Sequence, residues 1–287
     1  MRIVKSRSIL PTSFICTEVK IVGPEPFQAN EFTDIWKGET RGGLVCIKTL
    51  RLNVRARAKS GLVQTLCQEA LVWRNLKHPN ILPFLGVNLQ LRAPNICLVS
   101  PWMKNGNINE FLSRNPDRDR VSAMLDVTQG LIYLHSCSPP IPHLDIRGSN
   151  ILVTDDERYC LSDCGLALAI ESHAPDISPS MWMGSLQWHP PETMDSTLLD
   201  DRYITARDIY SLGCTIFEIY AGEPPFSSLP SFAAILSAVL HSRDALEQPK
   251  TMPMDVWELF KDCILYYPDK RPSADDVGRR LEALLRH

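Results

Sequence analysis

Apolar residues recur at helical spacing in several parts of the chain. In the first, 60–76, one face of an amphipathic helix would carry Leu62, Leu66, Ala70, Trp73 and Leu76. The same spacing predicts five further helices, and all of them lie beyond residue 120. Their ranges are 121–135, 206–221, 232–240, 256–265 and 274–285.

Shorter apolar runs before residue 103 have the pattern of β-strands. The strongest is 44–47, a continuous apolar run after Gly42 and Gly43 that predicts a buried strand. Weaker runs predict four more strands, over 19–22, 32–37, 81–87 and 96–99. Because strands come first and helices follow, we expect an α+β fold with two lobes. The β-rich N-lobe, with one long helix, would span 1–103, and the α-rich C-lobe 104–287.

Composition acts mainly by excluding classes of protein. A net charge of −3 and a pI of about 6.2 argue against a nucleic-acid binder held by bulk electrostatics. No apolar run approaches the roughly 18 residues that a membrane span needs. The nine cysteines form no Cys-x-x-Cys pair and no secretory signal is visible, so we expect reduced thiols and a cytoplasmic protein. A metal site of Cys160, Cys164 and His143 would lack an evident fourth ligand.

The first candidate for chemistry is Lys48, which stands at the end of the apolar strand 44–47. A lysine there must lift its ammonium group out of a buried neighbourhood or pair with a carboxylate. Glu69 lies on the predicted helix and is a suitable partner, because such a pair can direct the ammonium group at an anion. The alternative is an ordinary surface ion pair of little energetic value.

A second set of candidates consists of oxygen-bearing side chains on predicted loops beside short apolar runs. Asp145 is followed by Asn150 and then by Asp163. Carboxylate and amide oxygens suit a Mg²⁺ ion that is held against phosphate. Asp145 is also placed to accept the proton of a hydroxyl group. Taken singly, each aspartate has the alternative role of a turn or cap residue, but the ordered set favours chemistry.

In order and spacing, seven motifs make the chain resemble a protein kinase domain over about residues 14–285. They are Val45–Lys48, Glu69, His143–Asn150, Asp163–Gly165, Pro190–Glu192, Asp208–Gly213 and Arg271–Ser273. The runs His78–Ile81 and Trp188–Glu192 look most like the tyrosine-kinase-like group of Ser/Thr kinases. The resemblance implies a bilobal kinase fold in a single domain over 1–287. It also implies that Arg271 pairs with Glu192.

The same resemblance implies ATP and Mg²⁺ as cofactors. The catalytic residues would be Asp145 as the base, with Lys48, Glu69, Arg147 and Asn150. Mg²⁺ would be held by Asn150 and Asp163. Besides Lys48 and Asp163, the nucleotide would contact Ile35, Cys46, Ser100, Pro101, Trp102, Met103 and Leu152. The activation loop would span 163–192, with Ser185 in the part that anchors the substrate.

The chain departs from the kinase pattern mainly in its glycine-rich loop. Glycine makes up only 14 of 287 residues, and Gln28, Asn30 and Thr33 stand where three glycines belong. Side chains there crowd the approach of backbone N–H groups to phosphate, and any position that needs a positive φ becomes costly. In addition, Leu144 replaces the arginine before the catalytic aspartate, and Cys164 replaces a phenylalanine.

Two functions follow from this balance of matches and departures. The first is an attenuated, ATP-dependent protein kinase that transfers the γ-phosphate of Mg-ATP to Ser/Thr hydroxyls of proteins. Its main support is that every catalytic side chain is present. The alternative is a pseudokinase that acts as a scaffold or allosteric regulator. In either case we expect a protein substrate or signalling partner, no nucleic acid and no membrane span. The sequence sets no oligomeric state.

Overall fold

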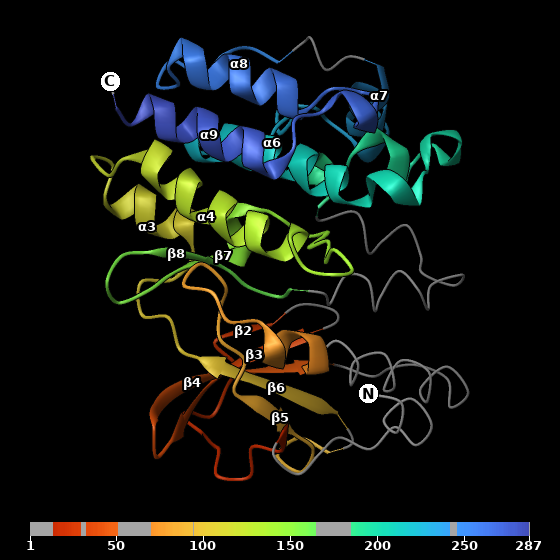
Figure 1. The fold of residues 1–287 in the computed structure, drawn as a ribbon. Coiled ribbons are helices and arrows are strands. Elements are labelled where there is room, and N and C mark those ends of the chain that lie inside the picture. Colours follow the sequence, from red (N-terminus) through yellow and green to blue (C-terminus); the bar gives the residue numbers. More distant parts are fainter. Residues whose placement is uncertain are drawn as a thin grey trace. The chain divides into compact units, whose positions relative to one another are not determined.

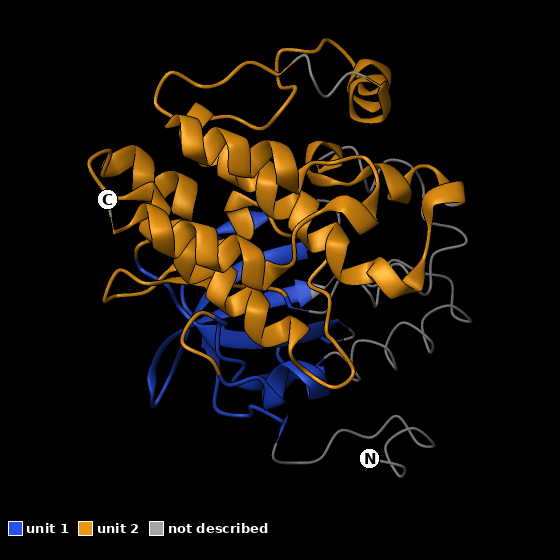
Figure 2. Ribbon diagram, turned by 45° about the horizontal axis from the view of Figure 1, so that its top comes forward, with its two compact units in different colours: residues 1–77, 81–104, 164–174 blue, residues 78–80, 105–163, 175–287 orange. Residues whose placement is uncertain are grey.

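The chain forms two compact units (Figure 2). Unit 1 comprises 1–77, 81–104 and 164–174, and unit 2 comprises 78–80, 105–163 and 175–287. The computed structural model describes residues 14–29, 33–50, 70–93, 95–164, 185–241 and 246–286. Unit 1 holds the larger sheet and unit 2 holds the long helices, which confirms the predicted α+β class.

The sheet of unit 1 is antiparallel (Figure 1). Its described strands are β1 (Lys20–Ile21), β2 (Gln28–Ala29), β3 (Thr33–Thr40), β4 (Gly43–Leu50), β5 (Gly86–Asn88) and β6 (Ile96–Pro101). Their order is β1-β3-β4-β6-β5, and β2 also pairs with β3. The β3–β4 hairpin turns through Gly43, whose φ of 119° is a conformation that glycine adopts without strain.

One face of this sheet forms the apolar core of unit 1. Trp36, Ile47 and Val99 lie directly opposite one another on β3, β4 and β6, and all three are buried. Residues directly opposite in an antiparallel sheet share a face. The core cluster consists of Val19, Trp36, Val45, Ile47, Cys97 and Val99. The alternate residues of the same strands therefore lie on the other face, which carries four of the nine predicted nucleotide contacts.

The predicted helix 60–76 is described only in its last part. Residues 70–75 are helical, and Ala70 and Trp73 are buried as the apolar stripe predicts. The part from 60 to 69, which includes Glu69, lies outside the described residues. Trp73 also stacks on Phe84 with ring centroids 4.7 Å apart, so this end of the helix packs on the segment that follows it.

The predicted strand 81–87 is wrong over most of its length. Only its last two residues lie in a strand, β5. Pro83 has no N–H group to give to a neighbouring strand. The carbonyl of Leu82 accepts a hydrogen bond of 2.7 Å from Nε1 of Trp73, so a side chain takes the place of a strand partner. Apolar content alone therefore predicted a longer strand than the backbone bonds allow.

Unit 2 is built around helices, and α3, α4 and α9 among them begin at a side-chain cap. Its α-helices are α3 (Ile108–Arg114), α4 (Arg120–His135), α6 (Ile204–Ala221), α7 (Phe232–His241), α8 (Met254–Cys263) and α9 (Ala274–Leu284). Asp119 caps α4 by accepting from the N–H of Val121, and a capping box of Ser273 and Asp276 begins α9. The five helices predicted beyond residue 120 are therefore confirmed within a few residues at each end.

Helix α6 is the centre of unit 2. Every residue from Asp208 to Ile219 is buried, and the helix packs against α4 and α8 (Figure 1). Two short antiparallel strands, β7 (Ile151–Val153) and β8 (Tyr159–Leu161), form a hairpin beside α4. The short helix α3 was not predicted, because its seven residues are too few to establish a period. No helix in the described ranges is long and apolar enough to cross a membrane.

Candidate active site

The loop 143–150 between α4 and β7 is fixed to α6 by the carboxylate of Asp208. This side chain is fully buried and accepts from the backbone N–H groups of His143 at 2.8 Å and Leu144 at 2.7 Å. Nε2 of His135 lies 2.8 Å from the same carboxylate. Burial alone would raise the pKa of Asp208, but the bond to His135 and the charges of the two histidines lower it below its ordinary value. The loop therefore rests on an ionised acceptor.

The residue Leu144 has a left-handed backbone within this loop, with φ of 65°. That conformation costs an ordinary residue about 1–2 kcal/mol. Its N–H bond to Asp208 and its burial hold it in place. Leu144 stands where the kinase pattern has an arginine. Its side chain is therefore packed in the interior and carries no positive charge.

The same loop brings three of the predicted catalytic residues together. Nδ2 of Asn150 donates to the backbone oxygen of Asp145 at 2.8 Å and to its Oδ2 at 2.6 Å. Nε of Arg147 lies 3.1 Å from Oδ1 of Asp145, and both side chains are about one-third exposed, at 31% and 29%. The carboxylate of Asp145 is thus oriented from both sides yet open to solvent, which suits an acceptor of protons.

The β7–β8 hairpin brings the two predicted metal ligands to the same end. Asn150 immediately precedes β7, and Asp163 is the second residue after the end of β8. The N–H of Ser162 donates to the Asn150 carbonyl at 2.9 Å. Asn150 uses its Nδ2 group in its bonds to Asp145, so its Oδ1 oxygen suits a cation. Two oxygen donors fit Mg²⁺, which keeps several waters. Leu152 lies in the middle of β7.

In unit 1, four predicted nucleotide or phosphate contacts share the sheet face opposite the core. Cys46 and Lys48 are two residues apart on β4, so they point to one face. Ser100 lies directly opposite Cys46, and Ile35 directly opposite Lys48. The side chains of all four therefore line one surface. Glu69, the predicted partner of Lys48, lies outside the described residues.

The predicted hinge residues Pro101, Trp102 and Met103 follow directly along β6. Pro101 ends the strand, and the N–H of Trp102 donates to the carbonyl of Leu44 at 3.1 Å. The Trp102 ring meets the exposed ring of Phe27 edge-on, with centroids 5.0 Å apart. The hinge is thus tied to the residue before β2.

The strands around the predicted glycine-rich loop carry side chains where glycines belong. Gln28 lies on β2 directly opposite Ile35, and Thr33 is the first residue of β3. Neither residue is among the described residues with positive φ, so the expected strain does not arise at these two positions. The exposed Gln28 shares a face with Ile35, where it supplies bulk. Asn30 lies outside the described residues.

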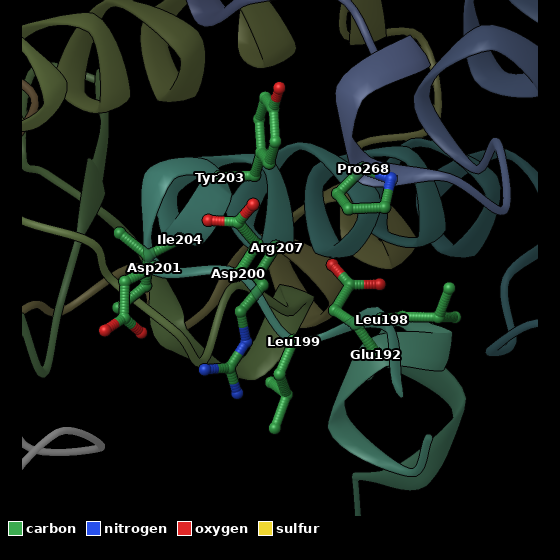
Figure 3. A pocket seen from close by; sticks show the side chains of 9 residues that line it. All are labelled: Glu192, Leu198, Leu199, Asp200, Asp201, Tyr203, Ile204, Arg207 and Pro268. Atoms are coloured by element: carbon green, nitrogen blue, oxygen red, sulfur yellow. The ribbon is translucent and has the colours of Figure 1, made fainter. Parts of the chain in front are cut away.

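The end of the predicted activation loop, at Glu192, is held by a buried ion pair. The guanidinium of Arg271 meets both carboxylate oxygens of Glu192 at 2.6 and 2.7 Å, which confirms the implied pairing. Figure 3 shows the small hollow beside this pair. Its lining residues are Glu192, Leu198, Leu199, Asp200, Asp201, Tyr203, Ile204, Arg207 and Pro268. None of the predicted site residues lines it.

His189 is a buried base in the same segment. Its Nε2 lies 3.1 Å from Oγ of Ser185, the residue predicted to anchor the substrate. Burial, and then the charges of Arg207 and Arg147, lower the pKa of His189 to about 3. The imidazole therefore stays neutral at physiological pH and fixes the Ser185 hydroxyl.

We predict a measurable pH dependence of stability from His189. Between pH 6.5 and 5.5 the unfolded histidine takes up a proton and the folded one does not, so this residue lowers the free energy of unfolding by about 1 kcal/mol as the pH falls. Urea unfolding at both pH values should show a smaller fall in His189→Gln than in the wild type. The exposed His241 provides the control, since His241→Gln should keep the wild-type dependence. Equal falls in wild type and His189→Gln would contradict the prediction.

Two residues beside the loop 143–150 were missed by sequence reasoning. Glu218 is an acidic residue inside the apolar run of α6, and it is buried with hydrogen bonds to the loop and to Trp188. Its position within an apolar helical run could have indicated a buried carboxylate with hydrogen-bond partners. The sequence around His189 gave no such sign, because a histidine before two prolines is compatible with a buried or an exposed position.

Comparisons with known proteins identify the family that the chain resembles. The profile of the protein tyrosine and serine/threonine kinase family matches residues 24–281. "Probable serine/threonine-protein kinase drkC" of Dictyostelium discoideum is 30% identical over 88% of this chain and 33% of its own length. For serine/threonine-protein kinase CTR1 of Arabidopsis thaliana the values are 27%, 91% and 31%. For serine/threonine-protein kinase TNNI3K of Mus musculus they are 28%, 97% and 33%.

The match extends over most of the chain, which spans about one-third of the length of these relatives. The relatives are named as serine/threonine kinases, in agreement with the predicted tyrosine-kinase-like group. Protein kinases as a family use ATP and Mg²⁺. This chain therefore belongs to the family of protein tyrosine and serine/threonine kinases.

Proposed function

We propose that residues 1–287 act as one kinase domain, with lobes 1–103 and 104–287, that transfers the γ-phosphate of Mg-ATP to Ser/Thr hydroxyls of a protein. The observation that carries this proposal is the arrangement around Asp145. Asn150 and Arg147 contact its carboxylate and orient it. The loop that carries Asp145 is itself fixed to α6 by Asp208. The Ser/Thr class is supported by the names of the relatives.

Each residue has a defined task in the proposed reaction. Asp145 accepts the proton of the substrate hydroxyl at its carboxylate. Arg147 places positive charge beside that carboxylate and supports the charge that develops on phosphate. Asn150 and Asp163 would hold Mg²⁺, which when bound neutralises phosphate charge. Lys48 binds phosphate, and the sheet face with Ile35 and its neighbours accepts the adenine.

We propose further that this activity is attenuated. Gln28 places a side chain on the face where a glycine would leave the phosphates room to approach. Leu144 lacks the positive charge of the arginine in the kinase pattern, which pairs with a phosphorylated activation loop, so such phosphorylation would have less effect here. Both features reduce nucleotide affinity or activation while the residues around Asp145 remain in place.

The decisive experiment is a titration with Mg-ATP followed by a transfer assay. Ligand at 100 times Kd should stabilise the folded state by about 2.7 kcal/mol in thermal unfolding. Labelled phosphate should then appear on serine or threonine of a generic protein substrate. Binding without transfer would contradict the enzyme and favour the pseudokinase scaffold. An absence of any shift at millimolar Mg-ATP would overturn the nucleotide site itself.

A further inference from the structure

Residues 14–16 run along the outer edge of the sheet in unit 1. Ile15 forms a parallel bridge with Val87 of β5, and the N–H of Cys16 donates to the Val87 carbonyl at 2.8 Å. β5 is the last strand in the order of this sheet, and an edge strand offers its backbone groups to a further segment. We call residues 14–16 the strap, because they cover part of this edge.

Two residues of β5 are fitted to the strap. Nδ2 of the buried Asn88 donates to the Cys16 carbonyl at 2.7 Å. A Cβ added at Gly86 would lie 2.6 Å from the backbone oxygen of Phe14, which is closer than real Cβ atoms approach an oxygen. The strap therefore passes Gly86 at a distance that a side chain would prevent. It is seated at one defined place on β5.

The strap also contacts the end of the helix 70–75. The guanidinium carbon of Arg74 lies over the ring of Phe14, 6.0 Å from its centroid, which is within the range of a cation–π contact. The charge of Arg74 acts on a second residue of the strap as well. Burial raises the pKa of the Cys16 thiol, and the charge of Arg74 opposes that rise. Arg74 therefore links the helix to the strap.

The same end of the helix is bonded to the segment that leads into β5. Nη1 of Arg74 donates to the carbonyls of Phe84 at 2.9 Å and Leu85 at 3.1 Å. Trp73, one residue earlier, stacks on Phe84. The helix end and the strap are thus attached to consecutive parts of one chain segment, with Arg74 in contact with both.

The position of this helix end matters for Lys48 because of what precedes it in the sequence. Glu69, the predicted partner of Lys48, comes directly before Ala70, the first described residue of the helix. A displacement at Arg74 is passed on to Glu69 through the backbone that joins them. An ion pair requires its charged atoms within about 4 Å, so a small displacement is enough to weaken the pair.

We propose that the strap regulates phosphate binding, because it holds the helix end at Arg74 and thereby sets the ion pair of Lys48 and Glu69. This proposal rests on the proposed function, in which Lys48 binds phosphate. The strap is attached by single hydrogen bonds and a cation–π contact, each of modest strength. Displacement of the strap should therefore lower the affinity for Mg-ATP while the strand pairs of the sheet remain.

The test releases the strap in two independent ways. Asn88→Asp keeps the side-chain shape and the oxygen that accepts from the turn after β5, but replaces the donor to Cys16 with a second carboxylate oxygen. Phe14→Ala removes the ring over Arg74. We expect each variant to raise the Kd of Mg-ATP at least threefold. The Kd of adenosine, which lacks phosphates, should stay within 1.5-fold of wild type.

Matched variants in unit 2 provide the controls. Asn115→Asp likewise removes an amide donor to a backbone carbonyl, and Tyr267→Ala removes an exposed ring. Both should keep the wild-type Kd of Mg-ATP and of adenosine. Equal losses for the two ligands in Asn88→Asp and Phe14→Ala, or no loss for either ligand, would overturn the proposal.

A double variant tests the route through Glu69. Glu69→Gln alone should raise the Kd of Mg-ATP, because it removes the charge that pairs with Lys48. Adding Phe14→Ala to Glu69→Gln should change that Kd by less than 1.5-fold, since the strap then has no ion pair to set. If the two effects multiplied instead, the strap would act by another route and the proposal would be wrong.

Hydrogen exchange provides a readout that does not depend on nucleotide. Amides of 72–76 should exchange faster in Asn88→Asp and Phe14→Ala than in wild type, while those of 208–219 in α6 keep the wild-type rate. Unchanged exchange at 72–76 in both variants would overturn the hold of the strap on the helix. If the wild type bound no Mg-ATP, the proposed function would fail, and faster exchange at 72–76 would still establish that hold.

Discussion

Replacing Asp145 with asparagine is expected to lower phosphotransfer by about 10²–10⁴-fold, the usual contribution of a positioned base. The substitution keeps the size and shape of the side chain and removes its ability to take a proton. Asn150 and Arg147, which orient the carboxylate, are unchanged in this variant. Binding of Mg-ATP should therefore stay within a few-fold of wild type. Transfer of labelled phosphate and a thermal-shift titration measure the two quantities separately.

The control for this variant is Asp117→Asn. Asp117 is an exposed aspartate in the turn between α3 and α4, and its substitution changes the net charge by the same amount. We expect it to transfer phosphate at the wild-type rate. If Asp145→Asn and wild type gave the same amount of transferred phosphate, Asp145 would not be the base. That result would contradict the proposed kinase function.

Replacing Arg271 with leucine is expected to lower the free energy of unfolding by about 3–5 kcal/mol, because it leaves the buried Glu192 carboxylate without its partner. The side chains of the pair are 0% and 3% exposed, so water cannot replace the lost bonds. Arg271 also donates to the backbone carbonyls of Leu265, Ala206 and Tyr266. Those carbonyls would lose donors as well.

A surface ion pair in the same unit provides the control for the Arg271 variant. Arg280 lies 2.6 Å from Asp262, and their side chains are 39% and 51% exposed. Arg280→Leu should change the free energy of unfolding by less than about 1 kcal/mol. Urea denaturation of the two variants measures both values. If both variants lost less than about 1 kcal/mol in the free energy of unfolding, the Glu192–Arg271 pair would contribute little net stability.

Asp145 and the Glu192–Arg271 pair lie in different segments of unit 2. The bond between Glu192 and Arg271 stabilises the segment that precedes α6. Trp188 and His189 lie just before Glu192 in this segment. The bonds of Glu218 then relate this segment to the loop that carries Asp145. The segment 185–192 is therefore attached both to Arg271 and to α6.

Sequence patterns predicted most of the secondary structure because amphipathic spacing is local. The helices beyond residue 120 and the centre of β4 could be found from residues a few positions apart. Helix α3 is too short to show a helical period. The strand predicted over 81–87 was too long, because the carbonyl of Leu82 in this run bonds to the side chain of Trp73 and not to a neighbouring strand. Such bonds between side chain and backbone leave no trace in hydropathy.

The candidate site was only partly predictable for a related reason. The residues of the loop 143–150 came from motif spacing, and their roles stay predictions for the experiments above. The register of β3, β4 and β6 places Ile35, Cys46, Lys48 and Ser100 on one face. It required the pairing of Cys46 with Ser100, which is 54 residues further along the chain. Register depends on the whole sheet and its core, which no short window of sequence contains.

The sequence by itself determined the family, the α+β class and the residues available for chemistry, because these depend on local spacing and on the order of motifs. The tertiary structure alone decided how those residues are held. Asp208 and Glu218 bond to residues of the loop 143–150 that are 65 and 70 positions away along the chain, and Arg271 bonds to Glu192 across 79 positions. Buried polar groups must find partners, and only the folded chain brings such distant partners within hydrogen-bond distance.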